Sequence, residues 1–202
     1  MTTPRDLSIA AMDEAPRRPV EQGDLSLALA GAEVIDLLGA GAVTLDDDRI
    51  VPGGHRPALA DRLLDEAAES LVREAPYESV DDWLWRRGRG LHAAYVAALE
   101  ADGQLTREPR RGLSFRTGRT LPADTPEHRQ ATERWASDEP VLAALGAAVG
   151  IRDEPAEDSL SAADEAVVTV LASVHDALRE LEAVRQRRAI EDAAFDNIWR
   201  GP

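Results

Sequence analysis

The sequence predicts a mainly α protein, a single compact helical domain with two small antiparallel β-hairpins. Apolar residues recur at steps of three and four along most of the chain, which is the period of helices that bury one face. Two of these helical stretches end in glycine and pass into short strand-like segments joined by turn residues. The chain has 202 residues, of which 44% are hydrophobic. That is enough for one core, so one domain over residues 1–202 is expected.

The chain is expected to be organised around a helix that begins near Asp24. Leu27, Gly31, Val34 and Leu38 recur along it at helical spacing and define its apolar face. The carboxylate of Asp24 can accept a bond from a free backbone N–H and so cap the start of the helix. Gly31 makes the helix thin in the middle, which predicts that another helix packs closely there.

A hairpin is expected directly after this helix. Gly39 and Gly41 end the helix, because glycine adopts the left-handed conformation at least cost. Ala42–Leu45 and Arg49–Val51 are predicted to be its two strands. The aspartates between them, Asp46–Asp48, are turn formers.

Capping signals and periodicity predict seven further helices. Thr3-Pro4 and Thr125-Pro126 are typical helix starts, and Ser79 with Asp82 resembles a capping box. The predicted helices are Thr3–Met12, Leu59–Glu74, one opened at Ser79 and interrupted at Gly88, Leu91–Leu99, one opened at Thr125, one opened at Glu139, and Ala163–Arg188. The tail that follows, with Phe195, Ile198 and Trp199, either docks on the body or stays free of it.

A second hairpin is predicted after the helix that ends at Gly103. Gln104–Thr106 and Leu113–Phe115 are its expected strands, and Pro109–Gly112 is the turn between them.

Composition excludes several classes of protein. The chain has no cysteine, so disulfides, thiol chemistry and cysteine-based zinc sites are absent. No apolar run reaches signal-peptide or membrane-spanning length, which predicts a cytoplasmic protein. All 23 basic residues are arginine, which together with abundant alanine indicates a GC-rich genome. The net charge of −15 argues against non-specific binding to nucleic acid or anionic lipid over the whole surface.

The charge is unevenly distributed, and one segment is basic. Between Arg86 and Arg119 the net charge is +5, while the rest of the chain carries −20. A basic island in an acidic protein is the most informative charge feature of the sequence. Its arginines are Arg86, Arg87, Arg89, Arg107, Arg110, Arg111, Arg116 and Arg119.

Five motifs, in order, carry a resemblance to a known family. They are LSIAAMDE, then AGAEVIDLLGAGAVTLDDDRIV, then Leu63–Glu66, Ser79–Trp83 and Gly103–Thr106. In this order they resemble the Golgi phosphoprotein 3 family, and the GC-rich coding points to a bacterial member. The resemblance implies a non-catalytic peripheral membrane adaptor that reads phosphatidylinositol 4-phosphate and holds the cytoplasmic tails of client proteins.

The resemblance also implies positions for the headgroup site. The family's tryptophan falls at Glu21 in this chain, and the arginine before its glycine pair falls at Ala30. Its Arg-x-x-Arg pair becomes Arg89 and His92. The basic hairpin, residues 106–117, is expected to face the membrane and to assist self-association.

The candidate anion site combines these positions with their basic neighbours. Arg86, Arg87, Arg89 and His92 precede or begin a helix, where guanidinium groups and free N–H groups suit phosphate oxygens. The alternative is a solvated arginine-rich loop. Arg17 and Arg18 are further candidates for the same site. The hairpin arginines that face the membrane on this hypothesis are Arg110, Arg111, Arg116 and Arg119; alternatively, they protect a strand edge from pairing.

The sequence gives no positive signal for catalysis. The four histidines lack metal-ligand spacing, and no nucleophile motif surrounds any serine, so no metal, cofactor or enzymatic activity is expected. The leading hypothesis is a phosphoinositide- or anionic-lipid-binding adaptor on the inner face of a membrane. Two alternatives remain: a winged-helix-like regulator that binds nucleic acid, and a protein-interaction module that binds no lipid.

Overall fold

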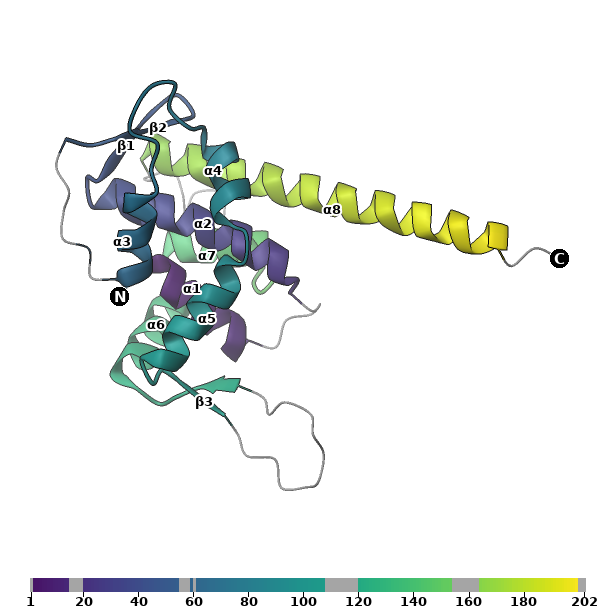
Figure 1. Cartoon of the computed structure of the whole chain (residues 1–202). Helices are drawn as coiled ribbons and strands as arrows, with labels where there is room; N and C mark the ends of the chain where they lie inside the picture. The colour runs from purple at the N-terminus through teal and green to yellow at the C-terminus, as the bar shows by residue number, and fades with distance from the viewer. Residues whose placement is uncertain are drawn as a thin grey trace.

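Helix α2 (Gln22–Gly39) lies at the centre of the protein, and most other helices pack around it (Figure 1). The structure is a computed structural model that describes residues 2–14, 20–54, 59, 61–107, 120–153 and 164–199. Helices α1 (Thr3–Asp13), α3 (Arg62–Glu69), α4 (Val80–Arg87), α5 (Leu91–Ala101), α7 (Pro140–Ala148) and α8 (Glu165–Trp199) all contact α2. Helix α6 (Pro126–Ala136) packs on α1 and α7. The described residues thus confirm a mainly α fold.

Helix α2 is buried on nearly all sides, not on one face as its spacing predicted. Leu27, Gly31 and Val34 are buried as expected, but Leu29 and Leu37 on the other faces are also fully buried. The reason is that six helices surround α2, so its exposed residues lie at its ends, at Gln22, Gly23 and Gly39. The helix also begins earlier than expected, at Gln22, so Asp24 lies in its first turn and the prediction that Asp24 caps it is wrong; Glu21 holds the cap position without a side-chain capping bond.

Gly31 lies where α8 crosses α2. A Cβ atom added at Gly31 would lie 2.3 Å from Cγ2 of Val174 and 3.7 Å from Cδ2 of Leu84. The prediction that a second helix packs closely on this glycine is therefore confirmed, and the partner is α8.

The first hairpin is confirmed with nearly the predicted bounds. Strands β1 (Val43–Asp46) and β2 (Arg49–Pro52) pair antiparallel, with Leu45 opposite Ile50. Asp47 takes the left-handed conformation, φ 52°, which the tight turn between the strands requires.

The second hairpin has a different return strand from the predicted one. Strand β3 (Leu105–Arg107) pairs antiparallel with β4 (Thr120–Pro122), so that Leu105 is opposite Pro122. The predicted return strand, Leu113–Phe115, and its turn lie outside the described residues. Among the described residues, the strand that pairs with β3 is therefore β4.

Capping residues determine where α3 and α4 begin. The side chain of Asp61 accepts a hydrogen bond from the Leu64 amide, 3.0 Å away, so α3 begins at Arg62 and is shorter than predicted. Ser79 accepts a bond from the Asp82 amide at 3.1 Å and also bonds its carboxylate. Ser79 thus caps α4 as the sequence predicted, but the Asp82 carboxylate accepts from the serine hydroxyl, whereas a full capping box would have it accept from the Ser79 backbone N–H.

Helix α8 is longer than its sequence pattern predicted. It runs for 35 residues, from Glu165 to Trp199, so the tail that was expected either to dock or to stay free continues the helix. Its first half packs on α2, α4 and α7, and its second half projects away from the body (Figure 1).

Candidate functional site

Arg87 of the basic island forms an ion pair with a buried carboxylate, that of Glu33. Its Nε and Nη2 atoms each donate to Glu33 at 2.8 Å, and Nη2 also donates to the Leu63 carbonyl at 2.9 Å. Glu33 is fully buried and also accepts a bond from the Tyr95 hydroxyl at 3.0 Å. Burial raises the pKa of Glu33, and the bonds from Arg87 oppose that shift. Arg87 therefore neutralises a core charge and does not point to solvent.

Arg86 is paired in the same way, but closer to the surface. Its Nε and Nη2 atoms donate to the two carboxylate oxygens of Glu78 at 2.6 and 2.7 Å. Its guanidinium carbon also lies 5.0 Å from the centre of the Trp83 ring. The indole of Trp83 is fully buried and donates to the Ala30 carbonyl at 3.1 Å.

Arg89 differs from both neighbours, because it is exposed and has no ion-pair partner within the described part of the chain. It lies between α4 and α5, beside the glycine that precedes the first turn of α5. It lines a groove of about 300 Å³, together with Gln22, Gly23, Ser26, Leu27, Trp85, Gly88, Gly90, His92, Ala93 and Leu181.

His92 lies in the same groove, in the first turn of α5. Its backbone N–H donates to Ser26 Oγ at 3.2 Å. Its ring atom Nδ1 is buried and has no hydrogen-bond partner in the described residues. Burial lowers the pKa of the imidazole. The groove thus brings together an unpaired cation, an unsatisfied ring nitrogen and a helix N-terminus, whose dipole favours anions.

The other predicted site residues lie outside the described residues. They are Arg17, Arg18, Arg110, Arg111, Arg116 and Arg119.

The two positions that the resemblance assigned to a family tryptophan and arginine are not neighbours in a surface site. Ala30 is fully buried in α2. Glu21 is exposed at the start of α2 and lies on a different groove from Arg89.

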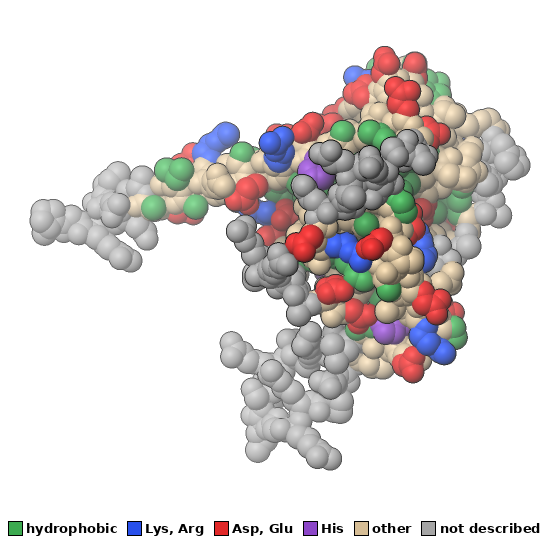
Figure 2. Space-filling view, turned by 180° about the vertical axis from the view of Figure 1, so that it is seen from behind, with side chains coloured by type: hydrophobic (Ala, Val, Ile, Leu, Met, Phe, Trp, Pro, Cys, Tyr) green, Lys and Arg blue, Asp and Glu red, His purple; other side chains and the backbone are tan. Residues whose placement is uncertain are grey.

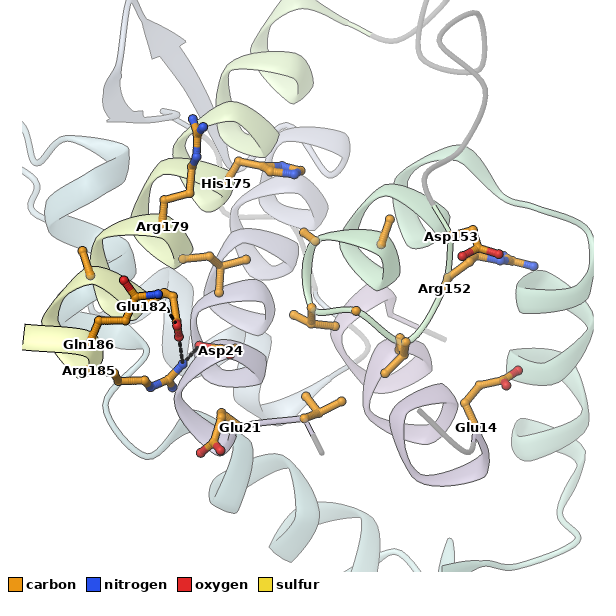
Figure 3. A pocket seen from close by; sticks show the side chains of 18 of the residues that line it. Glu14, Glu21, Asp24, Arg152, Asp153, His175, Arg179, Glu182, Arg185 and Gln186 are labelled. Atoms are coloured by element: carbon orange, nitrogen blue, oxygen red, sulfur yellow. Dashed lines mark hydrogen bonds and ion pairs between the residues drawn. The ribbon is translucent and has the colours of Figure 1, made fainter. Parts of the chain in front are cut away.

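This second, larger groove is acidic (Figure 3). It has a volume of about 1140 Å³ and lies between the start of α2, the end of α7 and the middle of α8. Its floor is apolar, with Val149, Ile151 and Leu178. Arg185 is neutralised by Asp24 at 2.7 Å. The acidic residues at this groove are Glu14, Glu21, Asp24, Asp153 and Glu182, against Arg152, Arg179 and Arg185.

The described residues offer neither a metal site nor a membrane-spanning helix. No group of three or more His, Asp or Glu side chains there could hold a metal ion. No helix in those same ranges combines the length and the apolarity needed to cross a bilayer.

Sequence reasoning missed the partner of Arg87 and the acidic groove. A weak signal for the first was available, because Glu33 stands alone among apolar residues in the middle of α2. The acidic groove gave no local signal, since its walls come from α2, α7 and α8.

Comparison with known proteins agrees with the order of motifs. Residues 4–199 match the family described as Golgi phosphoprotein 3 (GPP34). No curated protein matches the chain. Because the family match covers nearly the whole sequence, the chain belongs to the Golgi phosphoprotein 3 family.

Proposed function

We propose that the protein is a non-catalytic peripheral adaptor that binds an anionic lipid headgroup, with a phosphoinositide as the leading candidate. The binding site is the groove at the start of α5. One observation carries the proposal: within the described residues Arg89 is exposed and has no ion-pair partner, and it lines the same groove as His92, whose buried Nδ1 has no hydrogen-bond partner there. Arg86 and Arg87, by contrast, already satisfy carboxylates of the protein itself.

A phosphate group suits this groove chemically. The guanidinium of Arg89 can donate two bonds to phosphate oxygens, and the positive end of the α5 dipole adds to the attraction. The apolar wall formed by Leu27, Trp85 and Leu181 can accommodate the less polar part of a headgroup. The arginines of residues 106–117 would then add attraction to any anionic surface, without headgroup specificity.

His92 makes this binding sensitive to pH. Burial lowers its pKa, so the ring is neutral at pH 7 in the free protein. A bound phosphate would favour the protonated ring and raise that pKa. Binding should therefore strengthen as the pH falls through the pKa of the bound ring, and level off below the lowered pKa of the free ring.

A second candidate function is binding of a basic peptide, such as the tail of a client protein, in the acidic groove. The observation that favours it is the excess of carboxylates over arginines around an apolar floor. Glu21 is the clearest contact for such a peptide, because it is exposed and has no ion-pair partner in the described residues.

Vesicle sedimentation tests the lipid proposal. The parent should sediment with vesicles that contain phosphatidylinositol 4-phosphate, and more weakly at high salt, because the charges are exposed. Arg89→Ala should weaken binding about tenfold or more, since a hydrogen bond to a charged group contributes about 1.5–3 kcal/mol. Arg179→Ala is the matched control. It removes the same charge from an exposed arginine on α8 that does not line the Arg89 groove.

Two results would contradict this assignment. If the parent does not sediment with any anionic vesicle at low salt, the lipid proposal fails and binding of a basic peptide in the acidic groove remains as the candidate function. If Arg89→Ala and the parent bind equally well, the site lies elsewhere, and Arg17 and Arg18 are the next candidates. The double variant Arg110→Ala/Arg111→Ala separates a general membrane contribution from the headgroup site.

A further inference from the structure

The Arg89 groove has one arginine for a ligand that carries more than one charge. Among the described residues that line the groove, Arg89 is the only arginine. The ring of His92, whose pKa is lowered by burial, is neutral in the free protein. A phosphate monoester carries about −1.5 to −2 charges at pH 7, so one guanidinium leaves it incompletely neutralised. A second cation beside the groove would complete the site.

Arg185 of α8 lies at the rim of this groove. It follows Leu181, which lines the groove, by four residues, so the two side chains lie on one face of the helix, one turn apart. Gly23 of α2 also lines the groove, and a Cβ atom added to it would lie 3.1 Å from both Arg185 Nη2 and Leu181 Cδ2. The guanidinium therefore borders the groove, separated from it by a residue without a side chain.

Carboxylates of the acidic groove hold Arg185 on its other side. Figure 2 shows that α8 carries both arginine and acidic side chains where it leaves the body. Nη1 of Arg185 donates to Asp24 Oδ1 at 2.7 Å and lies 3.9 Å from Glu182 Oε2 (Figure 3). Nη2 donates no hydrogen bond within the part of the chain that the structure describes. The side chains of Arg185 and Asp24 are 31% and 24% exposed, and an ion pair that water reaches contributes little to stability, so this pair can open.

We propose that Arg185 is a second cation of the Arg89 groove, held in reserve by Asp24. The inference rests on the proposed function, because it assumes that the groove binds a phosphorylated headgroup. Once Asp24 no longer holds Nη1, rotation of the arginine side chain past Gly23 turns the guanidinium into the groove. There it can donate to phosphate oxygens that Arg89 leaves free, since a phosphate accepts from several donors at once.

The same ion pair couples the two grooves. Asp24 and Arg185 line the acidic groove, while Leu181 and Gly23 on either side of them line the Arg89 groove. A cationic side chain that pairs with Asp24 in the acidic groove would release Arg185 to the other groove. Binding of a basic peptide should then strengthen binding of the headgroup, and thermodynamic linkage makes the effect reciprocal.

A double-mutant cycle in the full-length protein tests the reserve cation. Its readout is sedimentation with vesicles that contain phosphatidylinositol 4-phosphate. Asp24→Asn frees Arg185 and should strengthen binding about tenfold, the usual effect of one hydrogen bond between charged groups. Arg185→Gln should remove that gain in the Asp24→Asn background and weaken binding only slightly in the parent, where Asp24 holds the arginine. Glu180→Gln is the matched control. It removes the same charge from an exposed residue of α8 that lines neither groove, and should change binding much less than Asp24→Asn does.

A short peptide tests the coupling between the grooves. A tripeptide amide with one arginine between two leucines should strengthen vesicle binding of the parent and leave that of Arg185→Gln unchanged. The inference is overturned, while the proposed function stands, if the parent sediments but Arg185→Gln weakens binding equally in both backgrounds. An Asp24→Asn gain no larger than that of Glu180→Gln, or a peptide without effect on the parent, would overturn it as well. If neither the parent nor any variant sediments, the lipid proposal itself fails, and the reserve cation fails with it.

Discussion

Replacing Arg87 by alanine should destabilise the protein much more than a surface arginine change does. Arg87 supplies two of the three hydrogen bonds to the carboxylate of Glu33. Without it, Tyr95 is the remaining donor to that carboxylate among the described side chains. The carboxylate would then be buried without a counterion, or would have to take up a proton.

The expected loss of stability follows from the burial of the pair. Glu33 is fully buried, and the side chain of Arg87 is 16% exposed. Removing one partner of a buried ion pair costs about 3–5 kcal/mol, against a total stability of about 5–15 kcal/mol for a typical domain. For a chain of this size, that loss corresponds to a fall in melting temperature of roughly 6–20 °C.

The loss should also depend on pH, with a definite sign. Burial already raises the pKa of Glu33, and removing Arg87 raises it further. A folded-state pKa above the unfolded value means that the folded protein holds its proton longer. The variant should therefore be most stable at acidic pH, and its stability should fall as the pH rises through that raised pKa.

Thermal and urea unfolding of the parent and of Arg87→Ala, at pH 5 and pH 8, measure both effects. Arg62→Ala is the control, because its ion pair with Glu66 is exposed and should contribute about 0.3–0.5 kcal/mol. If Arg87→Ala lowers the free energy of unfolding by less than about 1 kcal/mol, the reasoning is refuted, because an uncompensated buried charge costs more than that. Binding of the folded variant to vesicles should be unchanged, because Arg87 does not line the Arg89 groove.

Two further predictions concern the core. Gly31→Ala should cost roughly 1–3 kcal/mol in urea unfolding, because the new methyl group would overlap Val174; an unchanged midpoint would mean that α8 can move away at no cost. Asp6 is fully buried beside Arg134, and burial raises its pKa to about 6. Its contribution to stability is therefore full below about pH 4 and is lost as the pH rises through about 6, a difference of about 3 kcal/mol. Asp6→Asn should flatten that part of the stability curve, and a variant with the parent's pH dependence would contradict the assignment.

Local signals in the sequence were enough to predict most of the fold. Periodicity located the helices, Ser79 caps α4 as predicted, and the glycine at position 31 marked the close approach of a second helix. Bounds were less accurate, because Asp61 starts α3 late and α8 continues to Trp199. The return strand of the second hairpin was misplaced, since pairing depends on the partner strand and not on the loop's own pattern.

The candidate site was harder to predict than the fold, because side chains of consecutive residues reach different environments, one at the surface and one in the core. Arg86 and Arg87 are consecutive on α4, about 100° apart around the helix axis. One therefore reaches Glu78 near the surface, while the other reaches Glu33 in the core. Arg89 lies beyond the end of α4 and has no ion-pair partner in the part of the chain that the structure describes. A charge count over a segment detects the island, but it cannot tell which of its members are already neutralised by residues distant in sequence.

The central position of α2 has a consequence for how the protein opens. Since six helices cover it, no single neighbour can detach and leave all of its amides accessible to water. Its backbone hydrogens should exchange with solvent only when the whole protein unfolds. The projecting half of α8, in contrast, can fray turn by turn from its end without disturbing the body. Hydrogen exchange along the chain should thus report the global free energy of unfolding at α2, and values that decline steadily along α8 towards its C-terminus.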